Sequence, residues 1–364
     1  MNVLYLINHA GKAGTEKYVY NLVNAYNEKK CNCFFAYNEP GLLSEQMAEM
    51  NIKTFKIEMK NPFDLKAAKS LAKICRENNI DIIHTQYPRE NYIAILSRLF
   101  YKKVKVIYTC HLTLPVSPLW KITNALITPH QEKILSVCNN GKELLTAGGV
   151  NPNKIDVIFN GVFYKGEPDR KSTIREELNI SDDTFVISTL ARYHMAKGLD
   201  YFVRAIAEFD KIATKKYVVL IAGEGELWDE IKSLIHSYGL QDKILQLGFR
   251  RDSENILKGS DVFVNSAKCY EALSFAILEA LSNKLPVIAT NVGGNGDIIN
   301  KDTDCGYLVE YGDEIQMANA LKELSENEEL YKKFSENALK TIENRFNLDI
   351  LLEDIYKQYE NALK

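Results

Sequence analysis

The sequence predicts an α/β protein built from two doubly wound domains, each a parallel sheet covered by helices. Short apolar runs of strand length alternate with amphipathic stretches of helix length along most of the chain, as in parallel sheets that are buried on both faces. The 364 residues are more than one ordinary hydrophobic core holds. The alternation is interrupted near residues 161–171, where Gly166, Pro168 and several charges stand together. Two sheets in series follow, with the boundary at this interruption.

In the first half, the expected strands are separated by amphipathic stretches such as Glu16–Glu28 and Leu65–Glu77. Open parallel sheets bind ligands beyond the carboxyl ends of their strands, so we expect the functional site in a cleft between the two domains. The expected strands of the first half are Val3–Asn8, Cys33–Tyr37, Thr54–Ile57, Ile82–Gln86, Lys105–Cys110, Ile134–Val137 and Asp156–Phe159.

The second half repeats the alternation and ends in a helix over Leu348–Lys364, whose apolar residues recur at helix-face spacing. No strand follows this helix in the sequence, so it has to pack on a domain that is already complete. The expected strands of the second half are Phe185–Leu190, Val218–Ala222, Leu245–Gly248, Val262–Val264, Val287–Ala289 and Gly306–Val309.

Composition narrows the class of protein. Hydrophobic residues make up 46% and charged residues 26% of the chain, as in globular proteins. The seven cysteines form neither a Cys-x-x-Cys pair nor a zinc-type cluster, which favours buried thiols in a reducing compartment. The first strand is too short and uncharged for a secretion signal, and no apolar run has membrane-spanning length. We therefore expect a cytoplasmic protein.

Charge is distributed unevenly. Residues 1–163 carry 20 Lys and Arg against 13 Asp and Glu, a net charge of +7, and the remaining residues carry −10. The segment Arg98–Lys105 mixes cations with aromatic residues, as segments at a membrane edge do. These features indicate an anionic partner or attachment to an anionic membrane surface. We expect no nucleic-acid partner. An ordinary surface helix end is the alternative interpretation of Arg98–Lys105.

Two carboxylates eight residues apart, Glu271 and Glu279, mark a turn that leads into a helix. Ser274 is a candidate N-cap for a helix over Phe275–Asn283, which places Glu271 before the first turn and Glu279 inside the helix. The free backbone N–H groups of a helix start bind phosphate. An acid on each side of a phosphate site suits a ligand with hydroxyls flanking a diphosphate, as in a nucleotide-sugar. Two solvated helix-face charges are the simpler alternative.

These motifs together resemble the retaining glycosyltransferases of family 4, which have the two-domain GT-B architecture. The likeness rests on Glu271-x7-Glu279, the following Ala280–Val287, and Asn291-Val-Gly-Gly-Asn-Gly-Asp297, and it extends over essentially the whole chain. It implies two Rossmann-like domains facing across a cleft. The expected parts are an acceptor-side domain over 1–163, a donor-binding domain over 164–345, and a C-terminal helix over 346–364 that packs back on the first domain.

The segment Thr189–Gly198 ends a strand and begins a helix, and it carries Arg192 and Lys197. Arginine binds phosphate bidentately and lysine acts as a point charge, so the pair can neutralise a diphosphate leaving group. The resemblance makes them the family's pyrophosphate-binding pair. Two ordinary surface cations are the alternative.

By the same resemblance, Glu271 orients the donor sugar and Glu279 binds the ribose hydroxyls. The amides of Leu273 and Ser274 would add phosphate contacts. Arg192, Lys197, Glu271 and His111 are thus the expected catalytic residues, and Gly14, Leu273, Ser274 and Glu279 the expected donor-binding residues.

In the first domain, the loop His9–Lys17 follows a strand, and its glycines allow close approach to a phosphate. The family usually has two adjacent glycines here, whereas this chain has Ala13 before Gly14. His111 matches a histidine that lies near the donor sugar in the family. His84 also ends a strand, and we expect it to be structural.

Two further patterns resemble ligand-binding motifs without matching their context. Asp302-Thr-Asp304 resembles the metal-binding Asp-x-Asp of another glycosyltransferase architecture, but it stands in a polar turn before a strand. Gly223-Glu-Gly225 follows a strand, yet Trp228 occupies the place of the third glycine of a dinucleotide fingerprint. We expect neither a metal nor a nicotinamide cofactor.

The resulting hypothesis is a retaining glycosyltransferase that moves a hexose-type sugar from a nucleotide diphosphate sugar, UDP-linked by preference. The acceptor would be a glycan or a lipid-linked glycan of surface polysaccharide or glycolipid synthesis, which places the protein in the cytoplasm or on the inner face of the cell membrane. Two alternatives remain: a nucleotide-sugar epimerase of the same fold and a non-catalytic sugar-nucleotide-binding subunit.

Overall fold

The computed structural model describes residues 1–364 except 112–116, 165 and 170. The chain forms two compact units. The N-terminal unit contains residues 1–160 together with 349–364, and the C-terminal unit contains residues 161–348. Residues 165 and 170, which belong to the expected boundary segment 161–171, lie outside the described residues.

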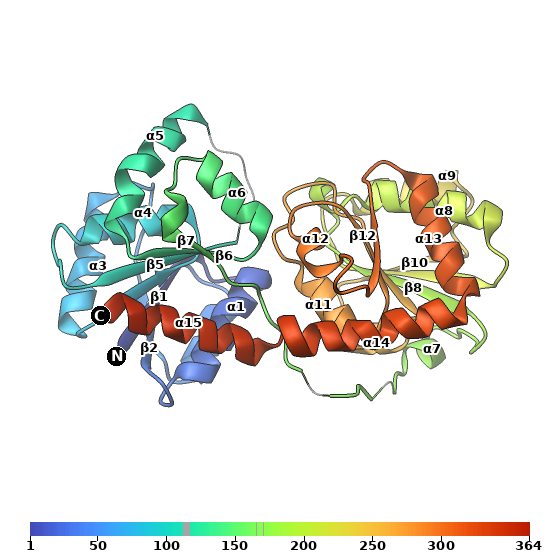
Figure 1. Ribbon diagram of the computed structural model, residues 1–364, viewed down its shortest axis with the longest axis horizontal. Helices are drawn as coiled ribbons and strands as arrows, with labels where there is room; N and C mark the ends of the chain where they lie inside the picture. The colour runs from blue at the N-terminus through green and yellow to red at the C-terminus, as the bar shows by residue number, and fades with distance from the viewer. Residues whose placement is uncertain (112–116, 165, 170) are drawn as a thin grey trace. The chain divides into compact units, whose positions relative to one another are not determined.

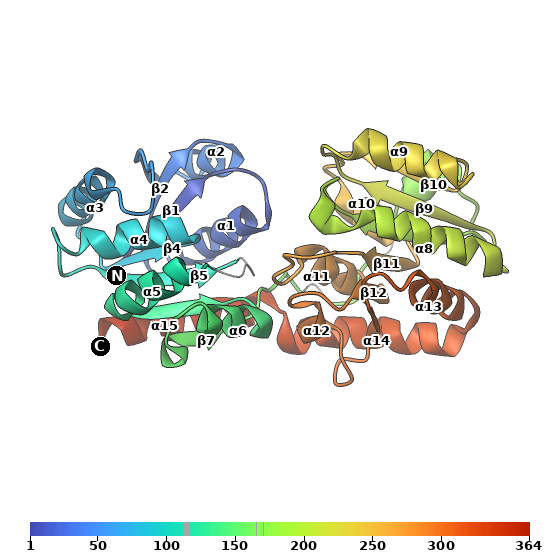
Figure 2. The same ribbon diagram turned by 90° about the horizontal axis from the view of Figure 1, so that it is seen from above.

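The N-terminal unit is a seven-stranded parallel sheet in the order β3-β2-β1-β4-β5-β6-β7. Helices cover both of its faces (Figures 1 and 2). Its strands are β1 (Asn2–His9), β2 (Asn32–Glu39), β3 (Lys53–Lys56), β4 (Ile82–Thr85), β5 (Lys105–Cys110), β6 (Lys133–Ser136) and β7 (Ile155–Val157). Its helices are α1 (Gly14–Tyr26), α2 (Leu42–Glu49), α3 (Leu65–Glu77), α4 (Pro88–Ser97), α5 (Pro118–Ile127), α6 (Asn139–Ala147) and α15 (Leu348–Leu363), with the 3-10 turns η1 (Thr128–His130) and η2 (Pro152–Lys154).

Successive side chains of β1 pack alternately on the two faces of the N-terminal sheet. Leu4 and Leu6 pack with the buried residues of α3 and α4, whereas Tyr5 points to the opposite face, where its hydroxyl accepts from that of Tyr359 on α15 at 3.2 Å. Successive side chains of a strand face opposite sides of a sheet, so one apolar strand supplies both cores.

Helix α15 returns to the N-terminal unit, as the sequence predicts (Figure 1). Leu351, Ile355 and Tyr359 are at most 2% exposed. The Tyr359 hydroxyl also bonds His84 Nδ1 at 2.6 Å, and His84 Nε2 bonds the Thr109 hydroxyl at 2.7 Å. Burial lowers the pKa of His84 to about 3, so a neutral imidazole ties this helix to the sheet.

The C-terminal unit is a six-stranded parallel sheet in the order β10-β9-β8-β11-β12-β13. Its strands are β8 (Phe185–Leu190), β9 (Tyr217–Ala222), β10 (Ile244–Gly248), β11 (Val262–Asn265), β12 (Val287–Thr290) and β13 (Gly306–Val309). Its helices are α7 (Ile174–Glu177), α8 (Leu199–Ile212), α9 (Trp228–Ser237), α10 (Ser253–Lys258), α11 (Phe275–Ser282), α12 (Asn295–Ile298), α13 (Glu314–Glu326) and α14 (Glu328–Arg345), with the 3-10 turn η3 (Met195–Lys197).

The main core of this unit lies between the sheet and the helices α8, α9 and α13, and a smaller one lies under α7 and α10. In both units the strand order reverses direction beside the first strand, which leaves loops free at the carboxyl ends of the central strands. Every strand expected from the sequence is present. The last strand of the first half differs from the expected Asp156–Phe159: the ladder to β6 pairs residues 155–157, so β7 begins one residue earlier and ends two residues earlier.

Candidate active site

The loop after β8 carries both cations singled out in the sequence. Arg192 is the second residue after the strand, is exposed, and makes no ion pair with another described residue. Lys197 ends η3, and Gly198 then adopts a left-handed conformation with φ of 60°. A Cβ at Gly198 would lie 2.2 Å from the carbonyl oxygen of Ser266, so glycine is required where this loop contacts the loop after β11.

Lys197 and Glu271 are in direct contact. The Lys197 ammonium donates to Glu271 Oε2 at 2.6 Å. The Glu271 side chain is 9% exposed and that of Lys197 is 35% exposed. The carboxylate is therefore largely buried with the Lys197 ammonium against it, while part of the ammonium remains accessible to a ligand.

The backbone of the Glu271 turn is fixed by a glycine loop. Gly293 has φ of 59°, and a Cβ there would lie 1.6 Å from the Glu271 carbonyl oxygen. The N–H of Gly294 donates to the Ala272 carbonyl at 2.7 Å. The Gly293-Gly294 pair of the sequence motif thus holds Glu271 in place, and any side chain at 293 would displace the turn.

Ser274 does not act as the side-chain cap expected from the sequence. It occupies the N-cap position of α11, but its hydroxyl caps no backbone N–H of that helix. The hydroxyl instead accepts from Asn265 Nδ2 at 3.1 Å, and Asn295 Nδ2 donates to Asn265 Oδ1 at 3.3 Å. This buried network ties the end of β11 to the starts of α11 and α12 and leaves N–H groups of the first α11 turn without a side-chain cap.

The other two residues of the C-terminal unit expected to bind the donor, Leu273 and Glu279, lie just before α11 and within it. Leu273 is 4% exposed and anchors the turn in the core. Glu279 lies within α11 and is half-buried. The helix ends at Ser282 rather than Asn283, which is its C-cap.

Two glycines have a role that the sequence did not reveal. Gly223 and Gly225 both have positive φ, and a Cβ on them would lie 1.9 Å from the Ala191 carbonyl oxygen and 2.5 Å from that of Tyr193. The loop after β9 therefore packs directly on the backbone around Arg192. A Gly-x-Gly directly after a strand was the available signal.

Other charged residues of the C-terminal unit are engaged in ion pairs of their own. Arg250, after β10, pairs with Glu177 at 2.5 Å and with Asp252 at 2.8 Å. Asp304 pairs with Lys333 at 2.6 Å, and Asp302 stands in the same exposed turn. Among the described residues, His, Cys, Asp and Glu form no group suited to holding a metal ion.

In the N-terminal unit, Gly14 is the first residue of α1 and is exposed. The N–H of Ala13 donates to Glu16 Oε2 at 3.0 Å. The Glu16 side chain, which is 5% exposed, thus caps the start of its own helix by accepting from the N-cap N–H.

His111 follows β5 and is half-buried. Its ring lies edge-on to Tyr18, with centroids 4.8 Å apart, and its Nε2 is 3.0 Å from Gln86 Oε1. Desolvation lowers the pKa of His111 to about 3. A neutral ring that donates Nε2–H to Gln86 has Nδ1 as its hydrogen-bond acceptor.

Glu90 is a buried acid that sequence reasoning missed. It lies in the first turn of α4, is fully buried, and accepts from the N–H of Asn8 through Oε1 at 3.2 Å. Oε2 has no partner among the described residues. Burial raises the pKa of Glu90 to about 8. No periodicity distinguished it from a surface glutamate, because the residues around it in α4 are also polar.

Family models match both halves of the chain. The model described as Glycosyltransferase Family 4 matches residues 13–163, and the one described as Glycosyl transferases group 1 matches residues 170–341. The chain is 30% identical over 300 residues to the UDP-Gal:alpha-D-GlcNAc-diphosphoundecaprenol alpha-1,3-galactosyltransferase of Escherichia coli, covering 78% of this chain and 76% of that one. The chain belongs to glycosyltransferase family 4.

Other relatives and structures agree with this assignment. An N-acetyl-alpha-D-glucosaminyl L-malate synthase of Bacillus anthracis is 25% identical over 86% of this chain and 82% of its own. The crystal structure of a glycosyltransferase from Rickettsia africae has a TM-score of 0.87 at 23% identity, covering 100% of this chain and 98% of that one. The Anabaena protein HepE, solved in complex with UDP, has a TM-score of 0.85 at 18% identity, covering 99% and 100%. The GT-B fold class is confirmed, and the protein is a glycosyltransferase.

Proposed function

We propose that this glycosyltransferase retains the anomeric configuration of a hexose that it transfers from a UDP-sugar to a glycan or lipid-linked acceptor. The observation that carries the proposal is the Lys197–Glu271 contact next to the start of α11. It brings a cation for phosphate and a carboxylate for hydroxyls into one place. The name of the Escherichia coli relative states a UDP-galactose donor and a diphosphoundecaprenol-linked acceptor, and HepE is solved with UDP.

The donor would lie along the β8 and β11 loops. The N–H groups of Leu273 and Ser274 and the positive end of α11 attract the diphosphate. Arg192 and Lys197 neutralise it, and Lys197 keeps further N–H donors for phosphate while one bonds Glu271. Glu271 accepts from hexose hydroxyls and Glu279 from the ribose.

The transfer needs no protein nucleophile. The acceptor oxygen bonds the anomeric carbon as the bond from that carbon to the diphosphate oxygen breaks. The acceptor proton passes to the departing phosphate on the same face of the sugar. Protein groups then act by positioning and by stabilising negative charge on the leaving group, and one such group contributes about 10²-fold or more.

In the N-terminal unit, neutral His111 would contribute as an acceptor. Its Nδ1 can receive a hydrogen bond from a sugar hydroxyl, and the Gln86 and Tyr18 contacts keep the ring oriented. With a pKa of about 3, the ring is an orienting group rather than a general base at neutral pH. Gly14 would allow backbone approach to a phosphate at the start of α1.

The reaction would proceed without a metal ion, since Arg192, Lys197 and the α11 amides supply the positive charge. Asp304 is already paired with Lys333, which leaves the Asp302-Thr-Asp304 pattern as a polar turn. Neither the epimerase nor the non-catalytic alternative explains a phosphate site with Lys197 and Glu271 joined in it as simply as sugar transfer does.

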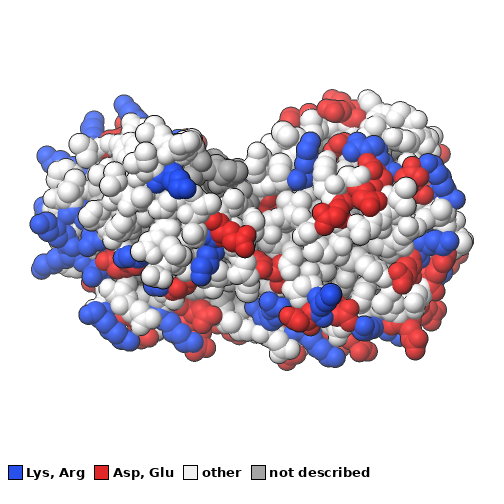
Figure 3. Space-filling model, turned by 45° about the horizontal axis from the view of Figure 1, so that its top comes forward, with Lys and Arg blue, Asp and Glu red and all other residues white. Residues whose placement is uncertain are grey.

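The acceptor would be met at a membrane surface on the cytoplasmic side. No helix among the described residues combines the length and apolar character needed to cross a bilayer. Helix α5, however, exposes Leu119, Ile122 and Leu126 at 61–73%, and none of its residues is buried. Figure 3 shows Lys and Arg gathered along the left-hand edge of the N-terminal unit and few charges where α5 comes forward. An apolar helix face with cations nearby suits peripheral attachment to anionic lipid.

The test is transfer from a panel of UDP-sugars to a polyprenyl diphosphate-linked sugar, with the anomeric configuration of the product determined by NMR. A retained configuration supports the proposal. An inverted product contradicts the mechanism, and conversion of the donor without any acceptor to a stereoisomeric UDP-sugar would establish the epimerase instead.

A further inference from the structure

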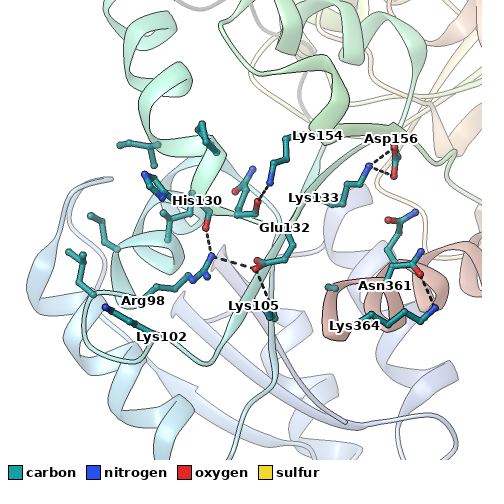
Figure 4. A pocket seen from close by; sticks show the side chains of 18 residues that line it. Arg98, Lys102, Lys105, His130, Glu132, Lys133, Lys154, Asp156, Asn361 and Lys364 are labelled. Atoms are coloured by element: carbon teal, nitrogen blue, oxygen red, sulfur yellow. Dashed lines mark hydrogen bonds and ion pairs between the residues drawn. The ribbon is translucent and has the colours of Figure 1, made fainter.

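A broad pocket of about 900 Å³ lies in the N-terminal unit, at the opposite end of its sheet from His111 and Gly14. Lys105 and Lys133 are the first residues of β5 and β6, whereas Cys110 and His111 stand at the far end of β5. Parallel strands put all their amino ends on one edge, so this pocket is separated by the length of the sheet from His111 and Gly14. Its charged lining residues are Arg98, Lys102, Lys105, Lys133, Lys154, Lys364, Glu132 and Asp156 (Figure 4).

Both acids of this pocket are already paired with cations. Glu132 lies 3.5 Å from Arg98 and 3.5 Å from Lys105, and it accepts from the N–H of Val106 at 2.7 Å. Asp156 lies 2.9 Å from Lys133. The pocket consequently has an excess of positive charge.

Lys102 and Lys154 are two of the lysines that contribute to this excess. Lys102 is exposed and has no ion-pair partner within the described part of the chain. Lys154 donates to the carbonyl oxygen of Gln131 at 2.8 Å, which leaves its charge uncompensated (Figure 4). Both are long, flexible side chains that can turn toward a bound anion.

Gln131 supplies an independent observation. It lines the same pocket and is 1% exposed, and neither Nε2 nor Oε1 of its side chain has a hydrogen-bond partner among the described residues. A buried amide without partners is costly, and native proteins satisfy such groups with protein, water or ligand. Once the side chain turns into the pocket, the amide offers donors for a phosphate oxygen and an acceptor for a hydroxyl.

We infer that this pocket is a second ligand site, for a phosphate ester that carries a free hydroxyl. Lys102 and Lys154 bind the phosphate, and Gln131 donates to it while accepting from the neighbouring hydroxyl. The same chemistry occurs in a soluble glycerol or sugar phosphate and in the headgroup of phosphatidylglycerol. The site is distinct from the donor site, and its occupant is not consumed by the transfer.

Hydrogen–deuterium exchange of the full chain locates the ligand without relying on activity. The probes are sn-glycerol 3-phosphate, and vesicles of phosphatidylglycerol compared with phosphatidylcholine, all at matched ionic strength. We expect slower exchange in residues 98–106 and 128–134. Protection by the soluble phosphate identifies a soluble ligand, and protection only by phosphatidylglycerol vesicles identifies the lipid headgroup; either result supports the site.

The variant Lys102→Glu/Lys154→Glu should weaken this protection at least about tenfold in ligand concentration, because two charge-assisted contacts are lost. The matched control Lys66→Glu/Lys69→Glu changes two exposed lysines of α3 by the same charge. It should shift binding by no more than about twofold, because distant charges are screened.

Gln131→Leu tests the amide itself. It removes two buried atoms without partners, so we expect weaker protection by the probes without a loss of thermal stability. The inference is overturned if no probe protects these segments, if the α3 control loses protection equally, or if Gln131→Leu binds the probes like the wild type.

Discussion

Lys197 Nζ and Glu271 Oε2 are 2.6 Å apart and join the loop after β8 to the turn before α11. The Glu271 side chain is 9% exposed, so the ion pair contributes to the structure in addition to the role that we propose for it in catalysis. Removing one member of such a pair leaves the other charge uncompensated in a poorly solvated place. Arg192, by contrast, is exposed and makes no ion pair among the described residues. We therefore expect replacement of Arg192 to affect turnover alone, and replacement of Lys197 to affect both turnover and stability.

Replacing Arg192 with Ala should lower turnover by ~10²-fold or more, because one group that stabilises the leaving diphosphate is lost. Its melting temperature should stay close to that of the wild type. Lys197→Ala should lower turnover similarly and also destabilise the fold by about 1–3 kcal/mol. Steady-state kinetics and thermal melts measure both, with Lys232→Ala on the exposed side of α9 as the control. Near-wild-type turnover in both site variants would remove the assignment.

The two glutamates should differ in what they recognise. Glu279→Gln should weaken binding of free UDP and of UDP-sugar alike, because ribose is present in both. Glu271→Gln should spare free UDP and weaken the intact UDP-sugar, since the amide still meets Lys197 but accepts less strongly from hexose hydroxyls. Calorimetry with both ligands provides the measurement. The same pattern in both variants would contradict this division of roles.

The sequence predicted the fold more completely than the site. Apolar runs such as Lys105–Cys110 and Phe185–Leu190 coincide with β5 and β8, because parallel strands buried on both faces give a local signal. The Lys197–Glu271 contact joins residues far apart in the chain, and the family motif gave their roles but not their pairing. The N-cap hydrogen bond expected for Ser274 is absent, because its hydroxyl bonds Asn265 instead. That bond depends on tertiary packing, which a preference for serine at N-cap positions does not take into account.

Transfer should persist in excess EDTA. In the proposed mechanism, Arg192, Lys197 and backbone N–H groups supply the positive charge that the leaving diphosphate requires, so we expect no need for a divalent ion. Initial rates with EDTA, and with Mg²⁺ or Mn²⁺ added back, are to be compared for the wild type and for Asp302→Asn/Asp304→Asn. Activity that vanishes with chelator and returns with metal in the wild type alone would show that the acidic turn binds the metal.

Helix α5 should contribute to membrane attachment. Replacing Leu119, Ile122 and Leu126 with Ser removes three exposed apolar side chains, each worth about 1.5–3 kcal/mol when fully buried, without removing a core contact. Sedimentation with phosphatidylglycerol vesicles should fall, and transfer to a lipid-linked acceptor should fall with it, while UDP binding is unchanged. The matched control replaces Ile315, exposed on α13 of the C-terminal unit, with Ser. Unchanged sedimentation of the triple variant would favour a soluble acceptor.

Because of Glu90, the free energy of unfolding should fall as pH rises from 4.5 to about 8. Burial raises its pKa from 4.5 to about 8, so the folded state favours the protonated carboxyl. The contribution of the Glu90 carboxyl to the free energy of unfolding is fully present below pH 4.5, where the group is protonated in the folded and in the unfolded chain. It is lost as pH rises to about 8, because the carboxyl of the unfolded chain ionises first. Glu90→Gln keeps a neutral side chain of the same shape. It should leave stability little changed at pH 4–5 and exceed the wild type by an amount on the order of a few kcal/mol at pH 8–9.

Urea unfolding between pH 4 and 9 measures this difference for the wild type, Glu90→Gln and the control Glu143→Gln. Glu143 is exposed on α6, so its variant should follow the wild-type curve at every pH. In Glu90→Gln the fall in stability between pH 4.5 and 8 should be reduced, because the group that titrates differently in the two states is gone. Parallel curves for the wild type and Glu90→Gln would mean that Glu90 is ionised in the folded protein and that its buried Oε2 is hydrated.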